Sequence, residues 1–404
     1  MHPVPFARPW LAVWLLAAAL TPAVAAPVWP PGFAGRTLAD APAIAAQPLT
    51  QDAALRRGLV GDAALYSLYR EHDIAPDALR DALARLPEPL ALRRDVLGAA
   101  SLGESASFEQ RLIDAAAQIN AAWLALANAE NAVAYRQSLV EAAGAARQLA
   151  EAQQAAGNLS QLAANAMLRD AARAEDALAE AQAQHADAQD ALAERLGLPP
   201  GTPVRTTGLA TLPAWPAWLA PTTLAAWAEA HSPALRRAAN AAALASKQAT
   251  RASPRPVRLP LLAHPLATAD DAGRLAGIPV AWLDATNAMQ SARRDIAIAG
   301  RRTTEAWQAT QRAQAMQTLA TQRSDEAIKH YNGMLLGVYE LLDARRATLD
   351  AAHETSAALG RFWLASARLE ALLGGSLPGP WPPTATATAT EPPPAGDPHR
   401  EHTP

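Results

Sequence analysis

Few residues of this chain are spaced so that they could do chemistry together, and the clearest pair is acidic. Glu340 and Asp343 are three positions apart, so on a helix their carboxylates lie on one face. Two neighbouring carboxylates hold cations and repel anions. Arg345 and Arg346 follow closely, and the alternative is an ordinary solvated face on which these charges pair.

No motif for catalysis accompanies the acids. The sequence has no G-x-S-x-G elbow, phosphate-binding loop, H-E-x-x-H pair or dinucleotide fingerprint. It has no cysteine, which excludes disulfides and thiolate metal sites. His399 and His402 could hold a metal loosely, but no third ligand stands near them. We therefore expect no enzyme activity, no metal site and no cofactor.

The composition favours long helices. Half of the 404 residues are hydrophobic, but only 5% are aromatic and alanine is abundant. Alanine is the best helix former and buries little surface per residue, so close lengthwise packing of helices is expected rather than a thick core. The net charge of −3 is small and no basic stripe occurs, which gives no indication of nucleic-acid binding.

The N-terminus has the organisation of a secretory signal peptide over residues 1–25. Arg8 precedes an apolar run from Trp10 to Leu20, and Ala23 and Ala25 offer a small-residue cleavage site. A membrane anchor is the alternative, but the run is short for a spanning helix. Without cysteine the chain also lacks a site for N-terminal lipid attachment. We expect an exported protein.

Proline-rich segments mark the two ends of the mature chain. Residues 26–48 contain Trp29-Pro30-Pro31 and are predicted to form an extended lead-in. Residues 376–404 are rich in Thr, Ala and Pro without apolar periodicity, and a disordered tail is predicted there.

Between the ends, the sequence predicts an internal duplication. The repeats span residues 49–197 and 222–375, joined by a connector over 198–221. Trp215, Trp218 and Trp227 cluster near this junction and are expected to pack the connector. Three landmarks recur in order: Leu65 with Leu235, Gly157 with Gly333, and Gly197 with Gly374. The separation within each pair is nearly the same, as a duplication requires.

The same order of elements is predicted in both repeats. A first helix (50–86; 222–251) precedes an irregular segment with prolines (87–103; 253–284). Two long helices then meet at the mid-repeat glycine, and their first arms are predicted over 104–156 and 285–332. Glycine suits a helix reversal because it tolerates positive φ; a helix merely kinked at glycine is the alternative.

The first long helix of the second repeat carries alanine at every seventh position. The series runs through residues 292, 299, 306, 313, 320 and 327. A strict seven-residue period imposes a left-handed supercoil, and small side chains let helix axes approach closely. Such faces suit helices laid side by side in a wall, although an alanine-rich helix can show the pattern by coincidence.

Two segments give the chain a recognisable resemblance. In Tyr331 to Gly375 an aromatic-x-Gly turn leads into Leu341-Leu342-Asp343-Ala344 and a long helix ending in Leu-Leu-Gly-Gly; Leu149 to Gly197 is its first-repeat counterpart. These segments resemble the signatures of the TolC-type outer-membrane efflux protein family, and the similarity extends from about Leu49 to Gly375.

The resemblance implies a mainly α fold of two repeated antiparallel helical hairpins, a coiled-coil tunnel, with short β segments. It implies a homotrimer at the outer membrane, serving a tripartite efflux system for small molecules or metal ions. The hairpin turns would be the tips that contact a periplasmic adaptor, which couples the channel to an inner-membrane pump. These turns comprise Gly157, Asn158, Leu159, Ser160, Gly333, Met334, Leu335, Leu336, Gly337 and Val338.

By the same resemblance, Glu340 and Asp343 would form an acidic gate at the closed end of the tunnel. The first repeat lacks matching acids, and the second turn is one residue longer than usual. The irregular segments also depart from the family, because Arg93 and Arg94 interrupt one and several prolines the other. A reduced or absent membrane barrel, and hence a periplasmic scaffold without an open pore, is the rival function. A periplasmic adaptor is a weaker rival, since adaptors carry one hairpin.

Overall fold

The computed structural model describes residues 47–72, 74–85, 102–251 and 280–378. The predicted signal peptide and nearly all of the lead-in lie outside these ranges. Within them the chain is almost entirely helical, with a single parallel β-bridge between Leu49 and Thr206. None of the helices described there combines the length and the hydropathy needed to cross a bilayer. The predicted mainly α fold is confirmed.

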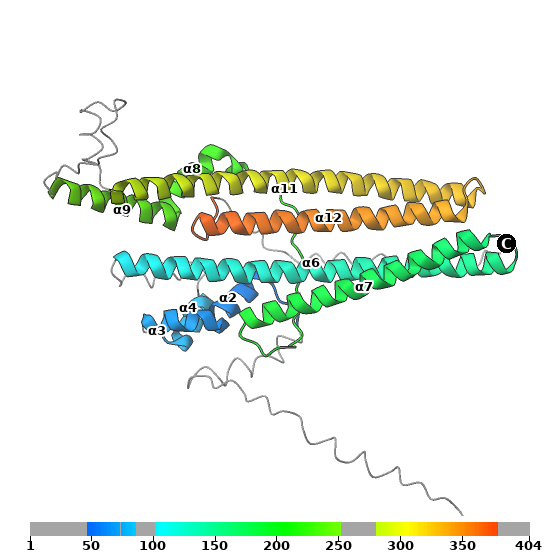
Figure 1. The fold of residues 1–404 in the computed structure, drawn as a ribbon, viewed down its shortest axis with the longest axis horizontal. Helices are drawn as coiled ribbons and strands as arrows, with labels where there is room; N and C mark the ends of the chain where they lie inside the picture. The colour runs from blue at the N-terminus through cyan, green and yellow to red at the C-terminus, as the bar shows by residue number, and fades with distance from the viewer. Residues whose placement is uncertain (1–46, 73, 86–101, 252–279, 379–404) are drawn as a thin grey trace, which may run out of the picture.

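Four long helices dominate the molecule: α6 (Leu102–Ala155), α7 (Gln161–Arg195), α11 (Val280–Asn332) and α12 (Val338–Leu372). α6 packs on α7, α11 packs on α12, and α6 packs on α12. The rods therefore lie side by side in the order α7, α6, α12, α11 (Figure 1). At about 1.5 Å per residue, the longest rods extend roughly 80 Å.

The two hairpins match position for position over their second arms. α7 and α12 both have 35 residues. The difference in residue number is therefore the same between their first residues, Gln161 and Val338, as between their last. The last residues of α6 and α11, Ala155 and Asn332, differ by this same number, which we call the repeat offset. The hairpin turns and the helices after them are thus built in one register.

The short helices correct the sequence-based expectation. The predicted helices over 50–86 and 222–251 are each broken. The second breaks at Ser232, because Pro233 begins a new helix and proline suits a first helical position, where its missing N–H has no partner to lose. Asp62 ends one helix and caps the next by accepting a bond from the Ala64 N–H at 2.9 Å. The elements observed are α2 (Gln51–Gly61), η1 (Ala63–Leu65), α3 (Tyr66–Glu71), α4 (Pro76–Arg85), η3 (Ala217–Leu219), α8 (Pro221–His231) and α9 (Pro233–Arg251).

At the end of each second arm, a glycine packs its backbone directly against the backbone at the end of a short helix; we call each of these contacts a joint. Gly197 follows α7 with φ +67°, and a Cβ there would overlap the carbonyl of Gly61 at the end of α2. Gly374 follows α12 with φ +90°, and its Cβ would lie 2.5 Å from the carbonyl oxygen of His231 at the end of α8. Both contacts require glycine, because no other residue has both the φ freedom and the space.

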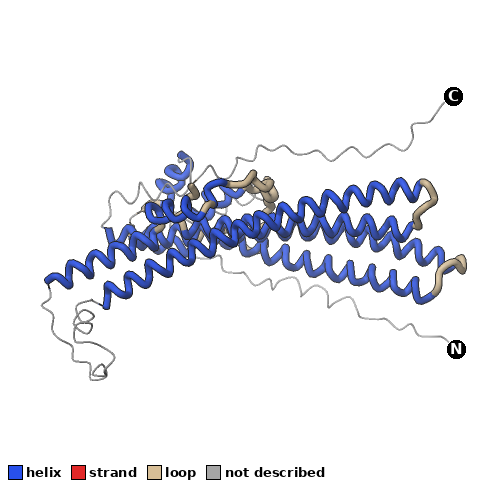
Figure 2. Tube along the Cα trace, turned by 90° about the horizontal axis from the view of Figure 1, so that it is seen from above, coloured by secondary structure: helices blue, strands red, loops and turns tan. Residues whose placement is uncertain are grey.

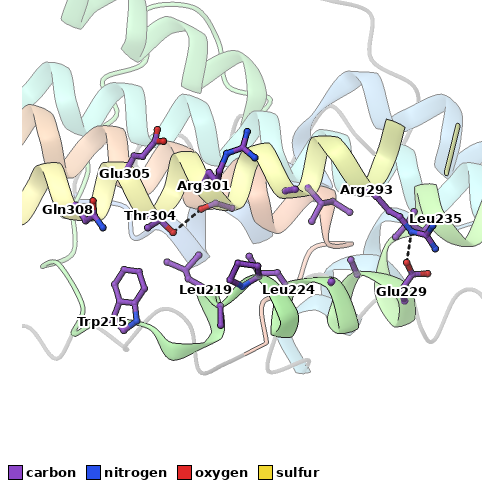
Figure 3. Close-up of a pocket in the computed structure, with 17 residues that line it drawn as sticks. Trp215, Leu219, Leu224, Glu229, Leu235, Arg293, Arg301, Thr304, Glu305 and Gln308 are labelled. Atoms are coloured by element: carbon purple, nitrogen blue, oxygen red, sulfur yellow. Dashed lines mark hydrogen bonds and ion pairs between the residues drawn. The ribbon is translucent and has the colours of Figure 1, made fainter. Parts of the chain in front are cut away.

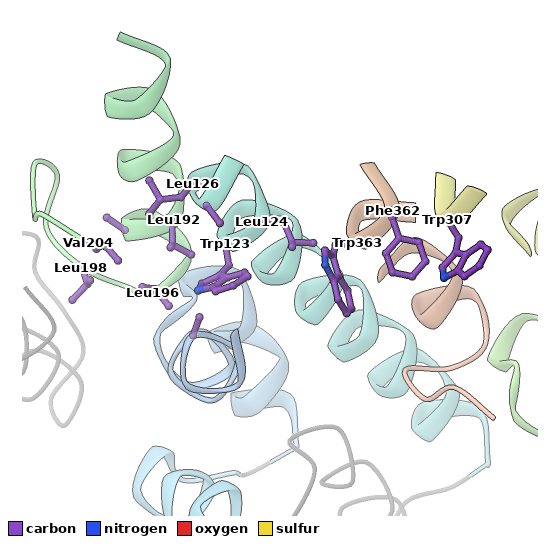
Figure 4. Close-up of a cluster of buried hydrophobic side chains, with 13 residues drawn as sticks. Trp123, Leu124, Leu126, Leu192, Leu196, Leu198, Val204, Trp307, Phe362 and Trp363 are labelled. Atoms are coloured by element: carbon purple, nitrogen blue, oxygen red, sulfur yellow. The ribbon is translucent and has the colours of Figure 1, made fainter. Parts of the chain in front are cut away.

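Tryptophan side chains hydrogen-bond the non-helical segments to the helices. Indole N–H groups donate to backbone carbonyls in four places, at distances of 2.9–3.1 Å. The pairs are Trp123 with Leu49, Trp363 with Ala210, Trp307 with Pro213 and Trp227 with Ser376. Figure 4 shows three of these rings in a row across α6, α12 and α11. Of the tryptophans predicted to pack the connector, Trp227 makes one of these bonds, whereas Trp215 is 47% exposed.

Two segment boundaries predicted from the sequence differ from those in the structure. Residues 87–103 and 253–284 lie mostly outside the described ranges, and their described ends, 102–103 and 280–284, are already helical. Ser376 and Leu377, assigned to the predicted tail, pack against the helices instead. The Leu377 side chain is buried in a cluster with Leu219 and Leu224. The packed part of the chain therefore continues past Gly375.

Candidate functional site: the hairpin tips and the seam between the hairpins

The first tip has the geometry that the sequence predicted. Gly157 adopts φ +75° just after α6. Its N–H bonds to the Gln154 carbonyl at 2.9 Å, and the Asn158 N–H bonds to the Gln153 carbonyl at 2.8 Å. This is a Schellman ending, in which the left-handed residue turns the chain out of the helix. Ser160 then caps α7 by accepting a bond from the Ala163 N–H at 3.2 Å.

The second tip shows that one residue assignment was wrong. Gly333 does not adopt positive φ; the left-handed residue is Met334, with φ +59°. The Leu335 N–H bonds to the His330 carbonyl at 2.8 Å, the same Schellman pattern one position later. Met334, which lies one repeat offset after Gly157, is therefore the counterpart of that glycine. The expected counterpart, Gly333, ends the helix before it.

This difference predicts opposite effects of two substitutions. Met334→Gly is expected to stabilise the second turn by up to about 1 kcal/mol, because it relieves a left-handed side chain. Gly157→Ala is expected to destabilise the first turn by about the same amount. Gly333→Ala serves as control, since its Cβ would meet only ordinary contacts at 3.5 Å. Urea unfolding of the purified variants measures all three; stabilisation by Gly333→Ala equal to that of Met334→Gly would contradict the assignment.

Both tips lie at the same end of the rods (Figures 1 and 2) and expose apolar side chains. Met334 is 94% exposed, Leu335 76% and Leu162, just after the first turn, 78%. Apolar side chains at this exposure are candidates for contact with another protein. Of the other predicted tip residues, Asn158, Ser160 and Gly337 are exposed, while Leu159, Leu336 and Val338 are half-buried.

The two predicted gate acids stand in the first turns of α12, and both are exposed. Glu340 has a structural task, because its carboxylate accepts a bond from the Gly337 N–H at 2.8 Å and so caps α12. Asp343 lies one turn further. Neither acid is ion-paired with Arg345 or Arg346 among the ion pairs of the described chain.

A seam that the sequence did not reveal joins the two hairpins between α6 and α12. Near the tips, the Tyr339 hydroxyl donates to the Gln153 side-chain oxygen at 2.8 Å. Further along, Gly360 of α12 lies so close to Asn128 that a Cβ there would displace the Asn128 side chain. The partners in each contact come from different repeats, far apart in sequence, so helical periodicity carries no signal of these contacts.

Aromatic and charged groups meet at the middle of the seam. The Tyr135 hydroxyl donates to the Asp350 carboxylate at 2.5 Å, and the Tyr135 ring stacks on the His353 ring at 4.1 Å. The Arg136 guanidinium lies 5.2 Å from the centre of the Tyr135 ring. Burial and the Asp350 bond raise the pKa of Tyr135 to about 12. Burial and the Arg136 charge lower the pKa of His353.

Comparison with solved structures identifies the type of fold. No family model and no curated protein matches the sequence. Solved structures do match: the structure of CusC has a TM-score of 0.56 and 14% identity, covering 81% of this chain and 92% of that one. The outer-membrane channel OprN gives 0.53 and 17%, with 81% and 90% covered. The outer membrane protein VceC of Vibrio cholerae gives 0.50 and 18%, with 71% and 76% covered. The fold is TolC-type.

Within this TolC-type fold, the seam holds together two hairpins that would have to separate for the tips to spread. At its centre, burial and the nearby Arg136 charge favour the neutral form of His353. No group of three or more His, Asp or Glu side chains in the described residues is arranged to hold a metal ion. The described arrangement consists of four rods, two tips and a contact between the hairpins that contains the titratable His353.

The contact between α6 and α12 at His353 is expected to weaken at acidic pH. The folded-state pKa of His353 lies below its ordinary value of 6.5, so stability from the neutral ring is present above pH 6.5 and is lost as the pH falls through the folded-state pKa. Asp350 and Glu354 oppose this shift, while Arg136 favours it. His353→Phe keeps a ring without the titration. Comparing unfolding midpoints at pH 7.5 and pH 5 should show a smaller pH effect in this variant; an unchanged effect would contradict the prediction.

Proposed function

We propose that this protein is the outer component of a tripartite efflux system, a passive duct for small molecules or metal ions at the outer membrane. The observation that supports it is the TolC-type layer of four rods with both apolar tips at one end. In this proposal an adaptor protein with a helical hairpin contacts the tips, and an inner-membrane pump supplies the energy. The duct itself performs no reaction.

The proposal includes an internal duplication and a ring of copies. Across the layer, second and first arms alternate: α7, α6, α12, α11. The outer edges, α7 and α11, are a second arm and a first arm, the same combination that α12 and α6 make at the seam. Laying α11 of one copy against α7 of the next repeats the seam between copies. A head-to-tail contact of this kind gives a ring when the rotation between copies closes, and we propose a ring of three copies, a homotrimer.

The repeat offset gives the register of that contact. The counterpart of Tyr135 is Arg312, and the counterpart of His353 is Asp176. Both Arg312 and Asp176 are exposed and oppositely charged, as partners should be. Met316 on α11 is 61% exposed, whereas its counterpart Leu139 on α6 is 9% exposed. We propose that Met316 becomes buried when the ring forms.

Cysteine cross-linking tests the ring, because the chain has no native cysteine. With Arg312→Cys and Asp176→Cys in one chain, oxidation is expected to link copies into trimers on denaturing gels. Glu175→Cys is the matched control for position 176, since Glu175 faces α6 and lies 3.8 Å from Arg147 of the same chain. Equal linking through 175 and 176, or no linking between copies, would contradict the register.

Tip substitutions test the efflux role in cells of the source organism. Met334→Asp with Leu335→Asp is expected to abolish complementation of a deletion strain, measured as accumulation of a panel of dyes and metal ions. Leu244→Asp is the control, because Leu244 is 59% exposed but lies on α9, away from the tips (Figure 1). A tip variant that complements fully would count against adaptor contact. Recovery of the protein wholly in the soluble periplasmic fraction would favour the scaffold without a pore.

We also propose that Glu340 and Asp343 gate the duct as an acidic ring at the tips. Because Glu340 caps α12, Glu340→Gln preserves a side-chain acceptor while it removes the charge. In planar bilayers, Asp343→Asn with Glu340→Gln is expected to reduce cation selectivity severalfold. If the cation selectivity of the double variant equals that of the unchanged protein, the two acids do not form the gate.

A further inference from the structure

A groove of about 640 Å³ separates α8 from the middle of α11. Its floor is apolar, with Leu219, Leu224 and Ile296, and its α11 rim carries Arg301 and Glu305. Figure 3 shows the Trp215 ring at one end of the groove, and at the other end the Arg293–Glu229 ion pair of 2.8 Å. The volume is ample for a large aromatic side chain, and the floor would favour one.

The first repeat has a tryptophan where the second has a gap. Gly300 of α11 lies one repeat offset after Trp123 of α6, and Leu224 holds the same place in α8 as Ala54 holds in α2. Trp123 is buried at 3% exposure and donates to the Leu49 carbonyl at 2.9 Å. At Gly300, a Cβ would lie 2.8 Å from Leu224. Leu224 thus replaces part of the indole volume, and the groove is what remains.

The described chain ends beside this groove. Leu377 is buried in the same cluster as the floor residues Leu219, Leu224 and Ile296, and the Ser376 carbonyl accepts the Trp227 indole N–H at 3.0 Å. The sequence continues from Pro378 as Gly-Pro-Trp-Pro-Pro, with the tryptophan at 381. Three residues reach about 10 Å when extended, which is about the width of the helix to be crossed.

We propose that residues 379–383 of the same chain dock in this groove, with the Trp381 indole filling the space above Gly300. The segment is uncharged, which suits an apolar floor. Proline-rich segments dock in grooves lined by aromatic rings because little conformational entropy is lost, and Trp215 is 47% exposed at the groove end. This proposal is independent of the efflux function.

A second copy would fill the groove less well. On the register proposed for the ring, the residues that α7 of a neighbour would bring near this place are the counterparts of Gly360 and Trp363. These are Ala183 and Ala186. Their methyl groups carry too little volume to occupy a groove of about 640 Å³, so α7 of a neighbour would leave most of the groove open.

Alkylation of engineered cysteines tests the docking in the full-length, assembled protein. Ala225 lines the groove, whereas Ala226 faces the opposite side of α8; both are exposed. A cysteine at 225 is expected to react with a maleimide at least tenfold more slowly than in the same variant carrying Trp381→Ala. A cysteine at 226 should react equally with and without Trp381. Equal rates at 225 in the two backgrounds would overturn the proposal.

Cross-linking identifies which chain supplies the segment. Thr384→Cys with Ala225→Cys is expected to form a disulfide within one chain, while Thr384→Cys with Ala226→Cys should not. A disulfide that joins two chains would assign the groove to the tail of a neighbour and overturn the same-chain proposal. Linking of 384 to 225 and 226 alike would overturn docking in the groove altogether.

Discussion

Gly197→Ala is expected to lower the free energy of unfolding by about 2–4 kcal/mol, or to prevent folding, because two costs add at this position. The residue adopts φ +67°, which costs a side chain about 1 kcal/mol. The new Cβ would also overlap the backbone carbonyl of Gly61. Since a backbone cannot rotate away as a side chain does, α7 and α2 must separate, and overpacking of this kind typically costs about 1–3 kcal/mol.

A nearby glycine separates the two costs. Gly201 has φ +75°, but a Cβ there would meet nothing within 4 Å. Gly201→Ala should therefore cost only the conformational part, about 1 kcal/mol. Urea unfolding followed by helical circular dichroism gives both values. Equal losses in the two variants would show that the Gly61 contact is not as tight as described.

The same joint in the second repeat should respond in the same way. Gly374 has φ +90° and would bring a Cβ to 2.5 Å from the His231 carbonyl oxygen. Gly61 and His231 are the last residues of α2 and α8, two helices of the same length. A parallel loss in Gly374→Ala would show that the two joints are equally tight.

The long rods could be predicted from the sequence because their signals are local. Alanine-rich heptads run through the first arm of the second hairpin, and helix propensity acts over short stretches of chain. The predicted arms, 104–156 and 285–332, differ only slightly at their ends from α6 and α11. The hairpin order followed from the repeated landmarks, and the structure retains that order.

The joints and turns could not be read in the same way. The expectation of a left-handed glycine at the second tip selected Gly333, because glycine is the usual residue there. The chain instead places Met334 in that conformation, and the hydrogen-bond register of the helix ending decides the position rather than the residue type. The seam pair of Tyr339 and Gln153 depends on how two hairpins meet, which no local pattern encodes.

The sequence carries a local signal for the role of Glu340. A carboxylate three positions after a helix-capping residue is a known start signal, and Glu340 stands three positions after Gly337. The spacing of Glu340 and Asp343 predicts a shared helix face, but it does not show that the two acids have different partners. Among the described residues the two acids have different surroundings, with a capping bond at Glu340 and no such bond at Asp343.

Glu109→Ala is expected to cost about 3 kcal/mol of unfolding free energy. The Glu109 side chain on α6 is 6% exposed and forms an ion pair with Arg236 of α9 at 2.5 Å. Removing the carboxylate leaves the arginine without this partner at the contact between the first repeat and the second. Breaking a fully buried pair costs about 3–5 kcal/mol; Arg236 is half-exposed and can turn toward water, which places the value at the low end.

The pair of Glu229 and Arg293 is the matched control. Its distance is 2.8 Å, but both side chains are about half-exposed, so Glu229→Ala should cost less than about 1 kcal/mol. If both variants lose the same small amount, the link between α6 and α9 contributes no more than a surface pair. If Glu109→Ala alone is severely destabilised, the ends of the rods opposite the tips are joined by charge, whereas the contact described near the tips, Tyr339 with Gln153, is a neutral hydrogen bond. Spreading of the hairpins would then begin at the tips, where the duct is proposed to open.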